Sequence, residues 1–110
     1  MKSLFALSII AGSILTATSI VSAADGNALF ETNCVKCHGA DGKGDTKMGV
    51  KVGCKDFADA KYQETLTEDK ITKAIKEGVK DGDKVKMKAF PDLTAEDIKA
   101  LSDKVHSFKK

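Results

Sequence analysis

Apolar residues recur at helical spacing in two segments of the chain. In the first segment, Ile71 and Ile75 lie on one face between Thr67, which is a good N-cap, and Gly78, which is a common helix terminator. The acidic residues directly after Thr67 suit the positive end of a helix dipole. This pattern predicts a helix over residues 67–78.

The second segment lies at the C-terminus. Thr94 and Asp97 have the spacing of a capping box, in which each side chain caps the backbone N–H of the other. The apolar residues that follow recur at i, i+3, i+7 and i+10, so one face is apolar and His106 lies away from it. These residues are Ile98, Leu101, Val105 and Phe108. The sequence therefore predicts a helix that begins after Thr94.

Weaker helical signals lie nearer the N-terminus. Leu29 and Phe30 give residues 25–37 a short apolar face, and Gly39 would end that helix. Residues 57–66 are expected to form one or two helical turns.

The remaining segments are predicted to be loops. Five of the nine glycines fall within residues 39–53, among aspartates, which predicts a loop without helix or strand. Residues 81–83 predict a turn, and residues 84–93 predict an extended segment. No alternating strand pattern, repeat or linker is visible. We therefore expect an all-α single domain. Loops of this length would be unusual unless they enclose a group that fills the space between them.

The N-terminus has the features of a cleaved export signal. Lys2 precedes an apolar run over residues 4–14, and the small residues at 21–23 suit signal peptidase. The run is too short to span a bilayer, and no cysteine near the cleavage point would carry a lipid. We expect residues 1–23 to be removed, which leaves a soluble periplasmic domain of residues 24–110.

Composition limits what this domain binds and buries. After cleavage it has 17 lysines against 16 acidic residues and no arginine, which argues against a nucleic-acid groove. Dispersed lysines instead suit screened contacts with an acidic partner. Four phenylalanines, one tyrosine and no tryptophan supply only a modest core, so something else is expected to fill the centre. We expect a monomer without stable membrane insertion.

One motif carries specific chemistry. Residues 34–38, CVKCH, match C-x-x-C-H, the attachment pattern of c-type haem. On a helical turn the two thiols are about 4.5 Å apart along the axis, so both can add to the porphyrin vinyl groups. The next residue presents its imidazole to the iron from the same side. We expect one covalently attached haem c held by Cys34, Cys37 and His38.

Other interpretations of the motif fit less well. A thioredoxin-like dithiol needs a strand–helix–strand context that is missing, and a disulfide between Cys34 and Cys37 leaves His38 without a role. Zinc bound by Cys34, Cys37, His38 and Cys54 is an alternative, although adjacent residues are poorly spaced as separate tetrahedral ligands. Cys54 itself suits a small, partly buried position or an intermolecular disulfide.

Three residues are candidates for the second axial ligand. Met87 lies in the extended segment between the two firm helices, where a thioether would raise the potential and close the iron to substrates. Its alternative role is to fill a gap in the core. Met48 lies in the glycine loop among lysines, and His106 faces away from its apolar stripe. We predict that His38 and Met87 bind the iron.

These features resemble the small monohaem bacterial cytochromes c of class I. The similarity rests on residues 26–30 followed by CVKCHG, the glycine loop, Met87 with AFPDLT behind it, and AEDIKALSDKVHSF at the end. It spans essentially the whole of residues 24–110. The resemblance implies N- and C-terminal helices that cross beside the haem, His and Met axial ligands, and shuttling of single electrons between redox partners.

Three positions depart from the family pattern. The family usually has a proline after the motif whose carbonyl orients the axial imidazole, but no proline occurs between His38 and Phe90. A carbonyl near residues 52–53 is expected to take this role. Lys88 stands after the methionine where proline is common. Lys104 replaces an aromatic residue that packs on the first helix, so a looser crossing is expected.

The sequence therefore predicts an electron carrier and not an enzyme. Lys36, Lys86 and Lys88 are expected to surround the haem edge and to meet an acidic redox partner briefly. Two alternatives stay open. A five-coordinate haem without the Met87 bond would make a gas-binding or peroxidase-like module, and a zinc-stabilised exported domain would be a binding module.

Overall fold

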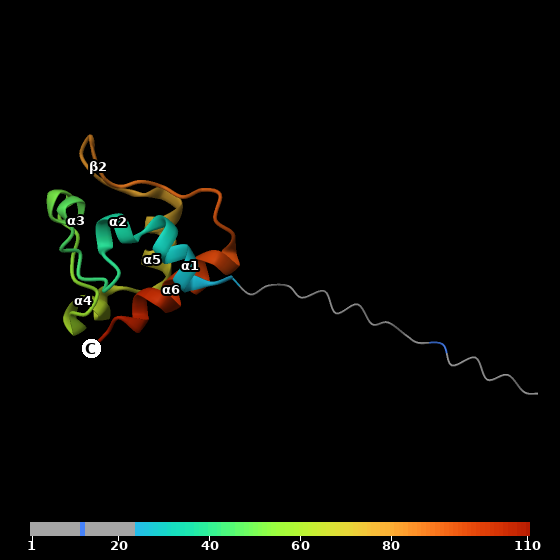
Figure 1. Ribbon diagram of the computed structural model, residues 1–110. Helices are drawn as coiled ribbons and strands as arrows, with labels where there is room; N and C mark the ends of the chain where they lie inside the picture. Colours follow the sequence, from blue (N-terminus) through green and yellow to red (C-terminus); the bar gives the residue numbers. More distant parts are fainter. Residues whose placement is uncertain (1–11, 13–23) are drawn as a thin grey trace, which may run out of the picture.

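Two helices from opposite ends of the domain lie across each other, as the family resemblance implies. They are α1 (Gly26–Asn33) and α6 (Ala95–Ser107) in the computed structural model (Figure 1). A Cβ on Gly26 would lie 2.5 Å from the carbonyl oxygen of Ala100. Because glycine has no Cβ, the two backbones meet directly at this point.

The structure describes residue 12 and residues 24–110. The predicted export signal, residues 1–23, lies outside the described residues apart from Gly12, and its cleavage stays a prediction. Within the described part of the chain, no helix is both long enough and apolar enough to cross a membrane.

Both helices predicted from apolar stripes are confirmed. α5 (Glu68–Glu77) begins after Thr67, whose hydroxyl accepts a hydrogen bond from the N–H of Lys70 at 3.2 Å. α6 begins after Thr94, which forms the predicted capping box with Asp97. These side chains satisfy backbone N–H groups that have no partner inside the helix.

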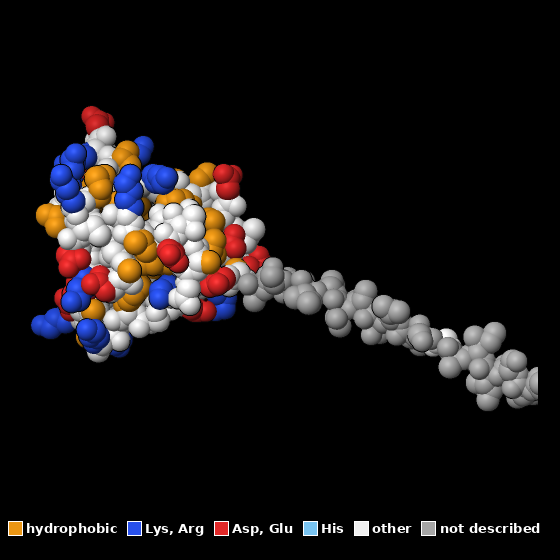
Figure 2. Space-filling model, in the orientation of Figure 1, with side chains coloured by type: hydrophobic (Ala, Val, Ile, Leu, Met, Phe, Trp, Pro, Cys, Tyr) orange, Lys and Arg blue, Asp and Glu red, His pale blue; other side chains and the backbone are white. Residues whose placement is uncertain are grey.

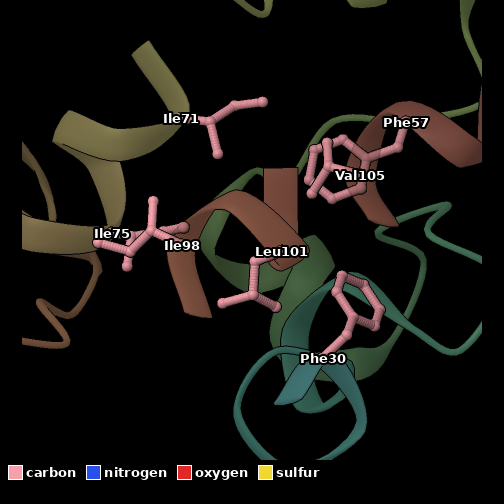
Figure 3. Close-up of a cluster of buried hydrophobic side chains, with 7 residues drawn as sticks. All are labelled: Phe30, Phe57, Ile71, Ile75, Ile98, Leu101 and Val105. Atoms are coloured by element: carbon pink, nitrogen blue, oxygen red, sulfur yellow. The ribbon is translucent and has the colours of Figure 1, made fainter. Parts of the chain in front are cut away.

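The core lies between α1, α5 and α6. Figure 3 shows Ile75 of α5 beside Ile98 of α6, and Leu101 of α6 beside the ring of Phe30 from α1. Phe30 and Leu101 are only 1% and 2% exposed, so the helix crossing is where apolar burial stabilises the fold most. The buried hydrophobic residues are Phe30, Phe57, Ile71, Ile75, Ile98, Leu101 and Val105.

The N-terminal helical segment is divided at Cys34. α1 ends at this residue, and α2 (Val35–His38) follows as a single turn that stops at Gly39. The predicted helix and its end are therefore confirmed, with a break that the sequence does not indicate.

A buried amide links the middle of the chain to α6. It belongs to Gln63 of α4 (Ala60–Thr65), the helix expected within residues 57–66. Gln63 Nε2 donates to the carbonyl oxygens of Phe57, at 2.6 Å, and Val105, at 2.9 Å. Since Gln63 is only 6% exposed, these bonds satisfy polar groups that water does not reach.

The prediction that residues 39–53 form a loop is wrong in part, because α3 (Lys47–Val52) lies within them. Thr46 caps the start of α3, and Gly53, with φ 77° and ψ 36°, ends it. A helix of six residues is too short to be stable alone or to show a clear apolar period. It forms where it packs against α2.

The all-α class is confirmed, and a short hairpin lies where the sequence predicts a turn and an extended segment. β1 (Val79–Asp81) pairs antiparallel with β2 (Lys84–Met87) through a turn that includes Gly82, at φ 61°. The turn at residues 81–83 is confirmed. Most strand residues are exposed, so neither face of the hairpin requires alternating apolar side chains, and the sequence shows none.

A hollow that includes Lys104 in its lining lies beside the crossing of α1 and α6. The hollow has a volume of about 350 Å³, and its lining residues are Asn27, Phe30, Glu31, Val35, Ala40 and Lys104. The Lys104 ammonium lies 4.8 Å from the centroid of the Phe108 ring. The helices meet directly at Gly26, so their crossing is close at that point.

Candidate functional site

The C-x-x-C-H motif forms one turn of helix, as the sequence predicts. The N–H of Cys34 donates to the carbonyl of Phe30 at 2.8 Å, which joins the motif to the end of α1. The N–H groups of Cys37 and His38 both donate back to the carbonyl of Cys34, at 3.2 and 2.9 Å. The two cysteines and the histidine therefore occupy one rigid turn attached to the core helix.

The side chain of His38 lies against aromatic rings. Its imidazole stacks on Phe57 with centroids 4.6 Å apart and an interplanar angle of 18°, and it lies 6.3 Å from the ring of Phe30. Burial lowers the pKa of His38, because the charged imidazolium loses hydration. The neutral imidazole, which is the form that binds a metal, is therefore favoured.

The backbone acceptor expected for this imidazole is not found. His38 Nδ1 is buried and has no hydrogen-bond partner among the described residues, so the predicted carbonyl near residues 52–53 does not reach it. In this arrangement the contacts with Phe57 and the backbone of the motif turn hold the ring.

The two motif cysteines are free thiols that are partly buried. Burial, with a smaller contribution from Cys37, raises the pKa of the Cys34 thiol to about 11. Reactive cysteines of dithiol oxidoreductases have lowered pKa values instead. The electrostatics of Cys34 therefore disagree with a thioredoxin-like role.

Cys54 is also a free, partly buried thiol. Burial raises its pKa first, and Cys37 raises it further, so the two thiols are close enough to interact electrostatically. Burial and then Cys54 likewise raise the pKa of Tyr62. These surroundings agree with the small, partly buried role expected for Cys54.

A hydrogen-bonded brace connects the motif turn to α3. The Thr46 hydroxyl lies 2.8 Å from the carbonyl oxygens of both Lys36 and Cys37, and it accepts from the N–H of Gly49 at 2.9 Å. A Cβ on Gly49 would lie 2.2 Å from the Cys37 carbonyl oxygen. The missing side chain therefore lets α3 lie directly on α2.

The structure separates the three candidates for the second axial ligand. Met87, at the end of β2, is half-buried and packs against the core cluster that includes Phe30 and Phe57. Met48 is 37% exposed on α3. His106 is exposed, and its Nε2 lies 2.7 Å from the carbonyl oxygen of Leu66. Of the two methionines, Met87 alone packs against the core cluster, and two members of that cluster, Phe30 and Phe57, lie beside His38.

The donors present fit a prosthetic group better than a protein-bound metal ion. Among the described residues, no group of three or more His, Cys, Asp or Glu side chains is arranged to hold a metal ion. The zinc site formed by Cys34, Cys37, His38 and Cys54 therefore has no support. Two neighbouring thiols, a neutral imidazole and a half-buried thioether instead match the attachment and ligand set of haem c.

Two residues that shape this site are not identified by the sequence analysis. Phe57 stacks on His38, and the Phe57 N–H donates to the carbonyl of Gly42 at 2.9 Å, which seats the ring. Thr46 braces the motif turn from ten residues away along the chain. The N-cap position of Thr46 before a short apolar segment is the only signal in the sequence that indicates it.

The helix crossing and the motif turn define a small helical domain that carries covalently bound haem. A sequence model of the cytochrome c family matches residues 23–107. The chain belongs to the cytochrome c family.

Other comparisons agree with this assignment. The KustC0563 c-type cytochrome, a solved structure, is 38% identical with a TM-score of 0.70, and the match covers 78% of this chain and 99% of that one. A search of curated proteins found no match. The chain is accordingly an electron-transfer protein with covalently bound haem c, and the resemblance to the class I cytochromes c is confirmed.

Proposed function

We propose that this chain is a periplasmic single-electron carrier, exported by residues 1–23, in which Cys34 and Cys37 hold the haem and His38 and Met87 bind its iron. The bound haem supplies the one-electron ferrous–ferric couple. The protein residues fix the group, set its potential and exclude water from it. No bond chemistry on a substrate is required, so we infer a carrier and not an enzyme.

One observation carries the proposal. Cys34, Cys37 and His38 share a single turn, and the core cluster that contacts His38 through Phe57 also contacts Met87. An imidazole and a thioether that both lie at one apolar cluster suit two axial ligands of one haem. A thioether ligand closes the iron to exogenous ligands, which favours electron transfer over gas binding.

A visible spectrum of the haem-loaded, periplasmically matured protein tests this ligand set. We expect a low-spin spectrum with a weak sulfur-to-iron band. Met87→Ala should remove that band and convert the iron to high spin, whereas Met48→Ala, a matched change at an exposed methionine, should leave the spectrum unchanged. If Met87→Ala keeps the wild-type spectrum, the ligand is Met48 or His106 instead.

The same experiment addresses the two alternatives. A five-coordinate module would be high-spin in the wild type and would bind carbon monoxide readily in its ferrous form. A zinc-stabilised domain would be colourless. Retention of the pigment after acid acetone treatment would show covalent attachment, and release of the pigment would contradict it.

The proposed partner is a redox protein with an acidic docking face. In the described part of the chain, the large hydrophobic residues that are exposed all lie on α3 or the hairpin. They are Met48, Val50, Val79 and Val85. Figure 2 shows lysine and apolar side chains gathered over this side of the molecule. An apolar patch among lysines suits brief docking of a protein that presents acidic residues around its own apolar centre.

Lys36, Lys86 and Lys88 are the lysines proposed for this contact. Lys36 lies in α2, and the other two lie at the end of the hairpin beside Met87. Steering by these charges makes association faster at low ionic strength. An electron-transfer rate with an anionic oxidant such as ferricyanide that does not change with ionic strength would contradict this part of the proposal.

A further inference from the structure

The end of the motif turn needs hydrogen-bond donors that the turn itself does not supply. α2 is a single turn, so the carbonyl groups of its last residues have no partner within the helix. Three consecutive carbonyls, those of Lys36, Cys37 and His38, are reached from residues 44–46. The Thr46 hydroxyl lies 2.8 Å from the first two, and the Gly44 N–H donates to the third at 2.8 Å.

The Thr46 hydroxyl joins two helices through one oxygen atom. It shares its hydrogen between the Lys36 and Cys37 carbonyls, and its lone pair accepts from the N–H of Gly49. The close contact between Gly49 and the Cys37 carbonyl keeps α3 against α2 and so holds the hydroxyl in place. The bonds to Cys37 and Gly49 are partly buried, which protects them from competing water.

The imidazole of His38 lacks the constraint that a hydrogen bond at Nδ1 would provide. This nitrogen is buried and has no partner in the part of the chain that the structure describes, so the position of the ring depends on its stacking with Phe57 and on the backbone from which it projects. That backbone is the last residue of the turn that Thr46 braces.

We infer that Thr46 is a positioning residue for the haem ligand His38, and that it acts through the carbonyls of Lys36 and Cys37. This inference rests on the proposed role of His38 as an axial ligand. Loss of the hydroxyl frees two carbonyls and lets the motif turn rotate, which changes the orientation of the imidazole plane at the iron. A role in capping α3 alone would not have this consequence.

Thr67 supplies a matched control. It is also an N-cap threonine, and its hydroxyl accepts from the third helical residue, Lys70, at 3.2 Å, but no bond joins it to α2. Thr46→Val and Thr67→Val thus remove the same cap interaction from two helices. Only Thr46→Val also removes the donor to the two carbonyls of the motif turn.

The test uses the haem-loaded ferric protein. Its paramagnetically shifted haem-methyl proton resonances report the orientation of the axial imidazole plane, and its reduction potential and melting temperature are measured in parallel. We expect Thr46→Val to change the pattern of methyl shifts and to shift the potential. Thr67→Val should lower the melting temperature only, and Thr46→Ser, which restores the hydroxyl, should return both haem signals to the wild-type values.

Thr46→Asp provides a second variant if Thr46→Val does not mature. A carboxylate at an N-cap still accepts from the Gly49 N–H but cannot donate to carbonyl groups, so it separates the cap from the brace. We expect the same altered methyl pattern. Wild-type methyl shifts and potential in the hydroxyl-free variants, with loss of stability alone, would overturn the inference. A wild-type protein without a low-spin haem spectrum would instead overturn the proposed function.

Discussion

The two sides of this molecule are held together in different ways. On one side, α1, α5 and α6 bury their large apolar side chains, with Phe30 and Leu101 almost inaccessible. On the other side, α2, α3 and the hairpin form what we call the cofactor-facing region. This region contains all the exposed large hydrophobic residues of the described chain, and Val50 on α3 is 69% exposed. Apolar packing therefore stabilises the first side far more than the second.

Polar contacts and close backbone approach replace packing in the cofactor-facing region. Thr46 and Gly49 connect α3 to α2, and Lys86 lies 4.0 Å from Asp81 across the hairpin. Such contacts contribute less than a buried core, so we expect this region to depend on bound haem more than the other side does. The difference indicates a rigid scaffold that carries a ligand-dependent site.

Removal of the haem should have the largest effect. In a Cys34→Ala, Cys37→Ala double variant purified without pigment, we expect the cooperative unfolding transition to be lost, because the remaining core is too small to stabilise the chain. Any residual amide protection should lie in α1, α5 and α6, and none in α3 or the hairpin. Hydrogen exchange followed by mass spectrometry measures this. Protection in α3 equal to that of the haem-loaded protein would show that the region is stable by itself.

A core truncation should have the next largest effect. Leu101→Ala removes a side chain that is 2% exposed, and we expect it to lower the free energy of unfolding by about 2–5 kcal/mol. Val50→Ala is the counterpart in the cofactor-facing region, and its effect should be within about 0.5 kcal/mol of zero. Denaturant unfolding of both haem-loaded variants provides the comparison. Equal losses from the two variants would show that the two sides do not differ in packing.

The side formed by α1, α5 and α6 is also the side that the sequence predicts well. The helix over residues 67–78 and the helix after Thr94 follow from caps and apolar periods that lie close together in the sequence, and both are confirmed. The motif turn at residues 34–38 is the one part of the cofactor-facing region that is predicted by a signal local in the same sense. Local signals of this kind predict the folded structure because core packing favours the same helices.

The cofactor-facing region depends on contacts between distant residues, so the sequence predicts it poorly. α3 forms because Thr46 reaches back to Lys36 and because Gly49 admits the Cys37 carbonyl. Neither interaction has a periodic signature. Within residues 24–110 no acceptor reaches His38 Nδ1, and this too depends on where distant segments lie and not on a local signal.

Removal of the buried Gln63 amide should have an intermediate effect on the free energy of unfolding. Gln63→Leu removes the side-chain donor to the Phe57 carbonyl and leaves the Val105 carbonyl with only the N–H of Phe108, so we expect a loss of about 1–3 kcal/mol in unfolding free energy. Since the Phe57 ring stacks on His38, the haem spectrum should also become sensitive to temperature below the main transition. Glu64→Leu, at the exposed neighbouring position, is the control and should change neither property. A Gln63→Leu protein as stable as the wild type would show that the bonds from Gln63 to α6 do not stabilise the fold.

Removal of a surface lysine charge should have the smallest effect on stability and a selective effect on electron transfer. Lys86 and Lys99 are matched, since each ammonium lies near an aspartate, at 4.0 Å from Asp81 and 3.9 Å from Asp103. Lys86→Gln and Lys99→Gln should each change the unfolding free energy by at most about 1 kcal/mol.

Only Lys86 lies in the hairpin beside Met87, so only Lys86→Gln should slow oxidation of the ferrous protein by ferricyanide at low ionic strength, by a few-fold. With a cationic cobalt oxidant the same change should raise the rate, because the removed charge repels that reagent. Stopped-flow rates that fall equally in both variants would place the electron-transfer surface elsewhere than the cofactor-facing region.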